Sequence, residues 1–163
     1  MKLKKLIFVL VLSCLCSESY SETLSGPRLG VSYLSPKTID FIEDKGLTVE
    51  PVITQFGWQF EKKFLTTTSG PEGITAIIPL FGGVEQGVFI PSLTWLTGLR
   101  LRNGYEFAVG PNVSVGTTGM AFVFGHTTKM GELFIPKNIG VVASKDGLRV
   151  SFLFGFNSKF EDN

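Results

Sequence analysis

The sequence predicts an all-β protein, an eight-stranded antiparallel up-and-down transmembrane β-barrel, and three observations support this. Large apolar side chains alternate with small or polar ones over many segments, and this period of two belongs to a β-strand. The composition combines 15 Phe and 19 Gly with only 18% charged residues. The mean hydropathy is +0.27, although no apolar run reaches the roughly 20 residues of a membrane helix. Membrane strands have this character because their apolar face is diluted by every second residue.

Residues 1–19 are expected to be a signal peptide, cut between residues 17 and 22. Three lysines precede an apolar run at 6–16, which is about half the length of a membrane anchor, and small or polar residues follow it. Residues 20–163 then form a single β-barrel domain. The cut removes three Lys and one Glu, so the formal net charge changes from +1 to −1. No basic excess remains to favour a nucleic-acid partner.

Both cysteines, Cys14 and Cys16, lie in this apolar run and leave with it. The mature chain is therefore expected to have no disulfide, thiol nucleophile or thiolate metal site. One alternative stays open, because Val11-Leu12-Ser13-Cys14 loosely resembles a lipobox, in which the cysteine is acylated. With one histidine and no phosphate-loop or dinucleotide motif, the sequence predicts neither a metal nor another cofactor.

The first half of the barrel is expected to hold four strands and one short helix. The first strand, 27–34, alternates three large residues with Gly and Ser. Residues 36–46 break the alternation and run from a proline to a glycine, which predicts one or two helical turns. The strand at 52–66 is the longest and carries aromatic residues at alternate positions. Strands at 74–81 and 88–102 follow.

The second half is expected to hold four more strands. Asn103-Gly104 is a strong hairpin signal, and it leads into a strand at 105–115 that alternates without a fault. Strands at 118–126 and 132–144 follow, the latter less regular. Asp146-Gly147 is a second hairpin signal before the last strand, 148–158, in which five large apolar residues occupy every second position.

Four prolines, Pro79, Pro91, Pro111 and Pro136, fall within the expected strands. A closed barrel has no edge at which a residue without an N–H group is easily accommodated. We therefore expect these prolines at strand ends or at bulges.

The bulky face of the strands is predicted to point outward, toward lipid. The opposite face is rich in Gly, Ala, Ser and Asn. Glycine weakens a water-exposed strand without any gain, but it fits the narrow lumen of a small barrel. Trp58, Trp95 and Tyr105 would suit the interfacial girdles. The candidate lipid-facing aromatic residues are Phe56, Trp58, Phe60, Trp95, Phe107, Phe122, Phe124, Phe152, Phe154 and Phe156.

Charged residues of the slim face are predicted to form a polar network in the lumen, because a buried charge needs a partner. Turning one of them to lipid would cost about 2–4 kcal/mol near the bilayer midplane. Arg102 shares the phase of this face. The candidate network comprises Glu61, Lys63, Arg100, Glu106 and Arg149.

The signal peptide, the alternating strands and the terminal Gly155-Phe156-Asn157-Ser158-Lys159-Phe160 together resemble small bacterial outer-membrane β-barrel proteins. In that class the last strand usually finishes on an aromatic residue that the insertion machinery reads, whereas here Glu161-Asp162-Asn163 follow Phe160. The resemblance implies location in the bacterial outer membrane, with its lipid and the insertion machinery as partners.

The predicted role is therefore a non-enzymatic outer-membrane barrel that is structural, makes surface interactions or forms a narrow pore. One alternative is a secreted or periplasmic soluble β-barrel with an apolar ligand inside its bulky face. Another is a membrane-embedded lipid-modifying enzyme, in which His126 would activate a neighbouring threonine hydroxyl. The sequence shows no convincing catalytic constellation, and a place for His126 at the interface or in a turn is the favoured interpretation.

Overall fold

A computed structural model describes residues 22–66, 70–115 and 117–159 of the chain. The predicted signal peptide, Cys14 and Phe160 lie outside these described residues. Within them, no helix is both long enough and apolar enough to cross a membrane.

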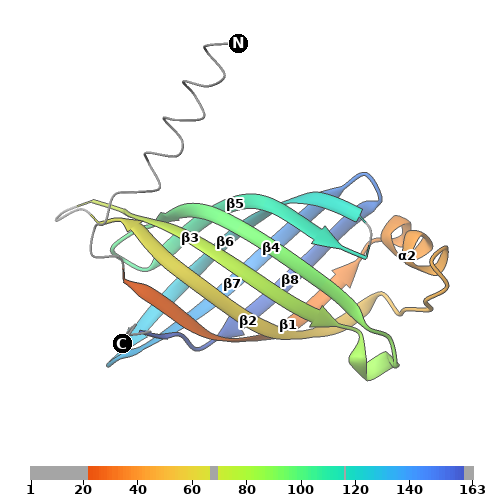
Figure 1. The fold of residues 1–163 in the computed structure, drawn as a ribbon, viewed down its shortest axis with the longest axis horizontal. Coiled ribbons are helices and arrows are strands. Elements are labelled where there is room, and N and C mark those ends of the chain that lie inside the picture. The colour runs from red at the N-terminus through yellow and green to blue at the C-terminus, as the bar shows by residue number, and fades with distance from the viewer. Residues whose placement is uncertain (1–21, 67–69, 116, 160–163) are drawn as a thin grey trace, which may run out of the picture.

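Eight antiparallel strands close into one barrel (Figure 1). Each strand pairs with the next along the chain, and β1 pairs with both β2 and β8, so no edge is left. The two-residue strand β9 continues the pairing of β8 with β1. The strands are β1 (Thr23–Leu34), β2 (Val52–Leu65), β3 (Glu72–Gly82), β4 (Ile90–Arg100), β5 (Tyr105–Ser114), β6 (Thr117–Met130), β7 (Leu133–Ser144), β8 (Gly147–Gly155) and β9 (Ser158–Lys159). The predicted fold class is confirmed.

The strand register fixes the width of the barrel. Paired residues followed once around the sheet lead from Thr23 of β1 back to Tyr33 of the same strand, ten residues further on. This stagger and the number of strands together set a tilted, narrow barrel whose interior side chains can fill. The circuit passes through Lys62, Thr75, Thr97, Val109, Phe122, Val141 and Val150.

Bulky side chains point outward along every strand. Trp95 is 59% exposed and Phe124 57%, whereas the residues on either side of each along the strand are buried or half-buried. The interior therefore takes the slim face, as the sequence predicted. One phenylalanine is an exception, because Phe134 is 8% exposed and fills the inside of the barrel near β9.

Several expected strand ends are corrected by the structure. β1 begins at Thr23, four residues before the expected start, since Pro27 pairs with Trp58 in mid-strand. β6 continues to Met130 instead of ending at His126. The last strand stops at Gly155, Asn157 then forms an isolated bridge to Phe134 of β7, and β9 pairs with β1.

All four prolines lie within strands, and two of them interrupt the pairing. The β2–β3 ladder skips the position where Pro79 would face Trp58, and the β4–β5 ladder skips the position where Pro111 would face Trp95. A proline cannot donate the missing hydrogen bond. The expectation of a strand end holds for Pro91, the second residue of β4. It is wrong for Pro79, Pro111 and Pro136, which lie inside β3, β5 and β7.

The two ends of the barrel differ (Figure 1). Short connections join β2 to β3, β4 to β5 and β6 to β7 at one end, which we call the turn end. At the opposite end, the helix end, α2 (Pro36–Glu43) lies in the long β1–β2 connection and η1 (Val84–Gln86) in the β3–β4 connection. The expected helix at 36–46 is thus confirmed, although it ends three residues earlier.

An apolar cluster closes the helix end. Ile42 of α2 and Val49 of the same connection pack on residues from the barrel mouth, and all of them are buried. Burial of the apolar side of α2 explains why this short helix lies against the barrel, since so short a helix is not stable alone. The cluster comprises Leu34, Ile42, Val49, Ile53 and Ile90.

Glycines on the inner face lie where the neighbouring backbone comes very close. A Cβ atom on Gly110 would be 1.8 Å from the carbonyl oxygen of Trp95, and one on Gly57 would be 2.1 Å from that of Pro79. The inner face of β7 is more open, because a Cβ on Gly140 would have no neighbour nearer than 3.5 Å.

This contrast gives a matched pair of variants. Gly110→Ala should lower the free energy of unfolding by about 1–3 kcal/mol, because β4 and β5 must move apart. Gly140→Ala should leave the free energy of unfolding unchanged or raise it by up to about 1 kcal/mol, because alanine lowers the conformational entropy of the unfolded chain. Urea unfolding of both variants in lipid vesicles measures the difference, and equal effects would refute the steric explanation.

Candidate functional site

The centre of the lumen is organised around Arg100, which forks between two carboxylates. Its Nη1 and Nη2 atoms donate to Glu61 at 2.6 and 2.8 Å, and its Nε atom donates to Glu106 at 2.8 Å. All three side chains are almost fully buried. Because β2, β4 and β5 each supply one member, this Arg100 cluster crosses the barrel interior.

A second arginine, Arg28 of β1, joins the cluster through an amide. Its side chain is 1% exposed, and its Nε atom donates to Gln59 at 2.9 Å. Gln59 in turn donates to Glu61 at 2.9 Å. Nη1 of Arg28 donates to Asn157 at 3.1 Å, so the network also reaches the end of the chain. Two arginines and two glutamates thus balance in charge.

Hydroxyl and amide groups complete the coordination of Glu106. Thr127 donates to it at 3.2 Å and Asn138 at 2.5 Å. Each carboxylate oxygen thereby has a donor, which is the condition for keeping a charge inside a protein.

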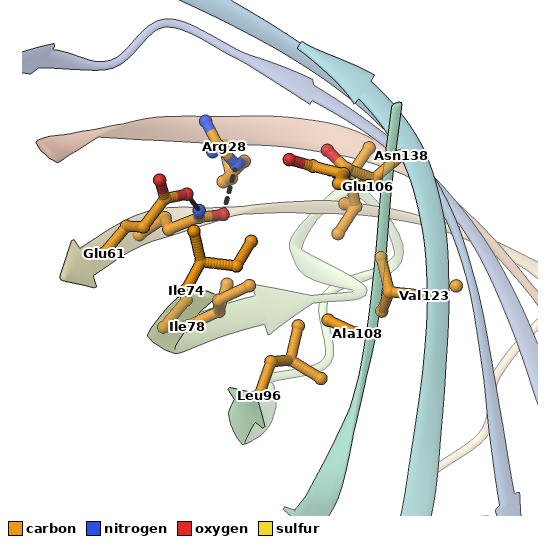
Figure 2. A pocket seen from close by; sticks show the side chains of 13 residues that line it. Arg28, Glu61, Ile74, Ile78, Leu96, Glu106, Ala108, Val123 and Asn138 are labelled. Carbon is orange, nitrogen blue, oxygen red and sulfur yellow. Dashed lines mark hydrogen bonds between the residues drawn. The ribbon is translucent and has the colours of Figure 1, made fainter. Parts of the chain in front are cut away.

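A cavity of about 40 Å³ adjoins this network. Figure 2 shows Arg28, Glu61 and Glu106 on one side of it and the apolar side chains of Ile78 and Leu96 on the other. This volume holds roughly three water molecules. The expectation of a polar lumen is thereby corrected, because β3 to β6 give one side of the lumen a buried apolar wall. This wall comprises Ala76, Ile78, Leu80, Leu96, Ala108 and Ala121.

Lys63 belongs to a separate cluster at the turn end. Its Nζ atom lies 2.6 Å from Glu22 and 3.1 Å from Glu72, and it also lies over the ring of Phe134. Lys159 of β9 is 2.7 Å from the other oxygen of Glu22. These contacts tie the beginning of β1 to β2, β3 and β9.

Arg149 lies apart, in the half of the lumen toward the helix end. It donates through Nη2 to Ser92 and to the side-chain oxygen of Asn112, both at 3.2 Å. A small polar layer neighbours it, in which Ser32 contacts Gln55 at 2.5 Å and Ser151 at 2.6 Å.

The structure thus divides the five candidate network residues among three places. It brings together Glu61, Arg100 and Glu106, and it places Lys63 and Arg149 in other layers. Arg102 is exposed in a turn, because β4 ends at Arg100. Sequence reasoning missed Arg28, although its phase with Gly30 and Ser32 could have identified it.

The candidate lipid-facing aromatic residues all lie on the exposed outer face. Trp58 and Trp95 occupy the middle of their strands instead of a barrel end, so of the three expected girdle residues only Tyr105 begins a strand. Each indole N–H donates to a hydroxyl on the neighbouring strand, Ser25 or Thr75. A tryptophan with its polar group satisfied in this way does not need the interface.

His126 also lies on the outer side of the barrel, near the turn end. Its ring contacts the carbonyl oxygen of Asn103 at 3.0 Å and packs edge-on against Tyr105. The hydroxyl of Thr128 is 3.4 Å from its Nδ1 atom, and that of Thr127 points inward to Glu106. Within the described chain no carboxylate contacts this ring, and no cluster of residues suited to hold a metal occurs.

No family model and no curated protein matches the sequence. Among solved structures, the chain is similar to Ail, the attachment invasion locus protein of Yersinia pestis. The two share 12% sequence identity with a TM-score of 0.57, over 86% of this chain and 97% of Ail. The chain has the fold of the Ail outer-membrane barrel.

Two further similarities are weaker. Ail in complex with the heparin analogue sucrose octasulfate superposes with 12% identity and a TM-score of 0.49, over 86% of this chain and 97% of that one. An acetoacetate decarboxylase-like enzyme from Sphingomonas wittichii shares 7% identity over 86% of this chain and 92% of its own, with a TM-score of 0.22. At 12% sequence identity, the likeness to Ail concerns the fold alone.

Arg100→Met tests the Arg100 cluster. The variant leaves two buried carboxylates without their cation, so its free energy of unfolding should fall by about 3–5 kcal/mol. Arg149→Met removes an arginine that no carboxylate of the described residues holds, and it should have a smaller effect. Urea unfolding curves of the two variants in lipid vesicles give this comparison, and a larger loss for Arg149→Met would contradict it.

The turn-end cluster should make stability depend on acid pH. Burial raises the pKa of Glu22, but hydrogen bonds from Lys159 and Lys63 lower it by more, so the pKa lies below its usual 4.5. Such a group stabilises the fold above its unfolded pKa, and the stabilisation is lost as pH falls through the folded pKa. Between about pH 5 and pH 3, Glu22→Gln should therefore lose less stability than the wild type. Glu132→Gln, which changes an exposed turn carboxylate, serves as the control and should behave as the wild type does.

Proposed function

We propose that this chain is a non-enzymatic integral protein of the bacterial outer membrane, with a closed lumen and a structural or surface-interaction role. One observation carries the proposal: the outer face of the barrel is a continuous belt of exposed apolar side chains. It includes aromatic residues from strands all around the barrel, such as Phe56, Trp95, Phe107, Phe122 and Phe152.

This belt is incompatible with a surface bathed in water. Soluble monomers rarely expose a contiguous apolar patch above a few hundred Å². Among the described strand residues that point outward, the charged ones are Lys62 and Lys137, and both lie toward the turn end. A lipid environment removes the cost of exposing the belt. The outward direction of the bulky side chains also argues against the alternative of a soluble barrel, because that alternative needs the bulky face to line an internal ligand site.

The connections suggest an orientation. Barrels of this kind have short periplasmic turns and longer extracellular loops. The turn end would then face the periplasm, and the helix end, with α2 and η1, would face outward. The helix-end connections, 35–51, 83–89 and 145–146, hold six acidic residues and three lysines, which disfavours a polyanionic partner.

Closure of the lumen favours a surface role over passage of solutes. The Arg100 cluster spans the interior, and the apolar cluster under α2 covers the helix end. The cavity between β1 and the apolar wall amounts to about 40 Å³, which is far below a continuous pore. Arg28, Glu61 and Glu106, which line it, are held in structural hydrogen bonds, and His126 lies on the outer side away from them.

Export and insertion complete the proposal. The basic and apolar residues 1–19 would direct secretion, and the insertion machinery and outer-membrane lipid would be the partners of the mature chain. None of these steps needs a cofactor.

Membrane fractionation tests the location. The protein should stay with the outer-membrane pellet after washing with salt and should be released by detergent. In a gel it should migrate faster unheated than boiled, because the closed barrel stays compact. Recovery in the aqueous periplasmic extract would overturn the proposal. The lipid A and phospholipid compositions of a deletion strain carrying either the wild-type gene or the His126→Ala variant test the enzyme alternative. A change in composition that the wild type produces and His126→Ala does not would favour that alternative.

A further inference from the structure

Arg149 is a buried cation without a charged partner among the described residues. Its side chain is 9% exposed, and it enters no ion pair with a carboxylate of the described chain. Arg100 and Arg28 differ from it, since Glu61 and Glu106 balance both of them. A buried charge that lacks such compensation is expensive for any fold.

The hydrogen bonds of Arg149 leave most of its donors available. A guanidinium has five N–H donors. Nη2 uses its two on Ser92 and Asn112, whereas neither Nε nor Nη1 donates to any described residue. Asn112 is itself locked by donation to Thr94 at 2.8 Å and to Ser92 at 3.2 Å, so its oxygen stays directed at Arg149. The guanidinium is thus held in place on one side and left with three donors on the other.

A cavity of about 40 Å³ lies beside this guanidinium, beneath α2. Arg149, Asn112 and Ser114 contribute polar groups to it, and Ile42, Phe41 and Leu34 cover it from the helix end. The polar side contains donors and neutral acceptors, and no acidic residue is among those that line the cavity. This is the composition of a site for a negative ion.

We infer that the cavity beneath α2 binds one small monovalent anion, about the size of chloride, against the free donors of Arg149. The ion neutralises Arg149, which has no carboxylate partner among the described residues. Its apolar roof, made by α2, excludes bulk water and strengthens the attraction between the two charges. The volume admits a halide or nitrate but not a sugar acid or a phosphate ester.

The anion also links the barrel to its cover. Leu34, Ile42 and Arg149 line the same cavity, so an ion held there lies between β8 and α2. Binding to the folded state alone stabilises that state in proportion to the logarithm of ligand concentration. Chloride should therefore raise stability beyond the effect of ionic strength.

The experiment uses the full mature protein folded in lipid vesicles and unfolded with urea, in sodium chloride or in sodium gluconate at equal ionic strength. Gluconate is too large for the cavity. The wild type should unfold at a higher urea concentration in chloride. Arg149→Gln should abolish this difference, while Arg102→Gln, which removes an exposed arginine at the turn end, should retain it.

Crystals soaked in bromide give an independent measurement that needs no variant. Anomalous scattering should show one bromide within hydrogen-bond distance of Arg149. No chloride effect in the wild type, an effect that persists in Arg149→Gln, or bromide only at exposed lysines would overturn the inference. If Arg149→Gln does not fold, the bromide position decides. These outcomes are separate from membrane fractionation, which does not depend on the ion.

Discussion

Closing eight strands at this stagger leaves an interior only a few side chains wide, and the placement of every large residue follows from that limit. Where β4 and β5 approach most closely, the carbonyl of Trp95 occupies the space that a Cβ on Gly110 would need. Glycine is therefore required by the neighbouring backbone and not only by the width of the lumen. Bulk that the inside cannot accept points outward, which makes the outer face apolar and creates the need for lipid.

The same narrowness brings charges close enough to satisfy one another. Arg100 can reach Glu61 on β2 and Glu106 on β5 because the barrel interior separates them by little more than one side chain. A wider barrel would leave room for water between these groups. In the present barrel the ion pairs occupy one side of the lumen and the apolar wall occupies the other. The interior is therefore a packed core with its charged groups on one side.

The alternation of the sequence was sufficient to predict which residues face outward, because a period of two does not depend on the register of the strands. The strand count and the short helix followed from the same pattern and its interruptions. Partners in the lumen could not be predicted, since Arg100 and Glu61 are 39 residues apart and meet only through the register of three strands. Strand ends were missed where polar residues continue the pairing, as Thr127 and Thr128 do in β6.

In the proposed surface role, recognition of another molecule falls to the surfaces that remain polar, because the interior is closed. At the helix end these surfaces are already held in place. Glu85 of η1 accepts hydrogen bonds from the backbone and the hydroxyl of Thr54, and Gln86 contacts Glu50 and Val52. The two connections are thereby fastened to each other and to the mouth of β2. A surface fixed before binding loses little conformational entropy when a partner arrives. A barrel packed tightly inside can thus present a rigid polar face outside, and the packing beneath α2 is what keeps that face in position.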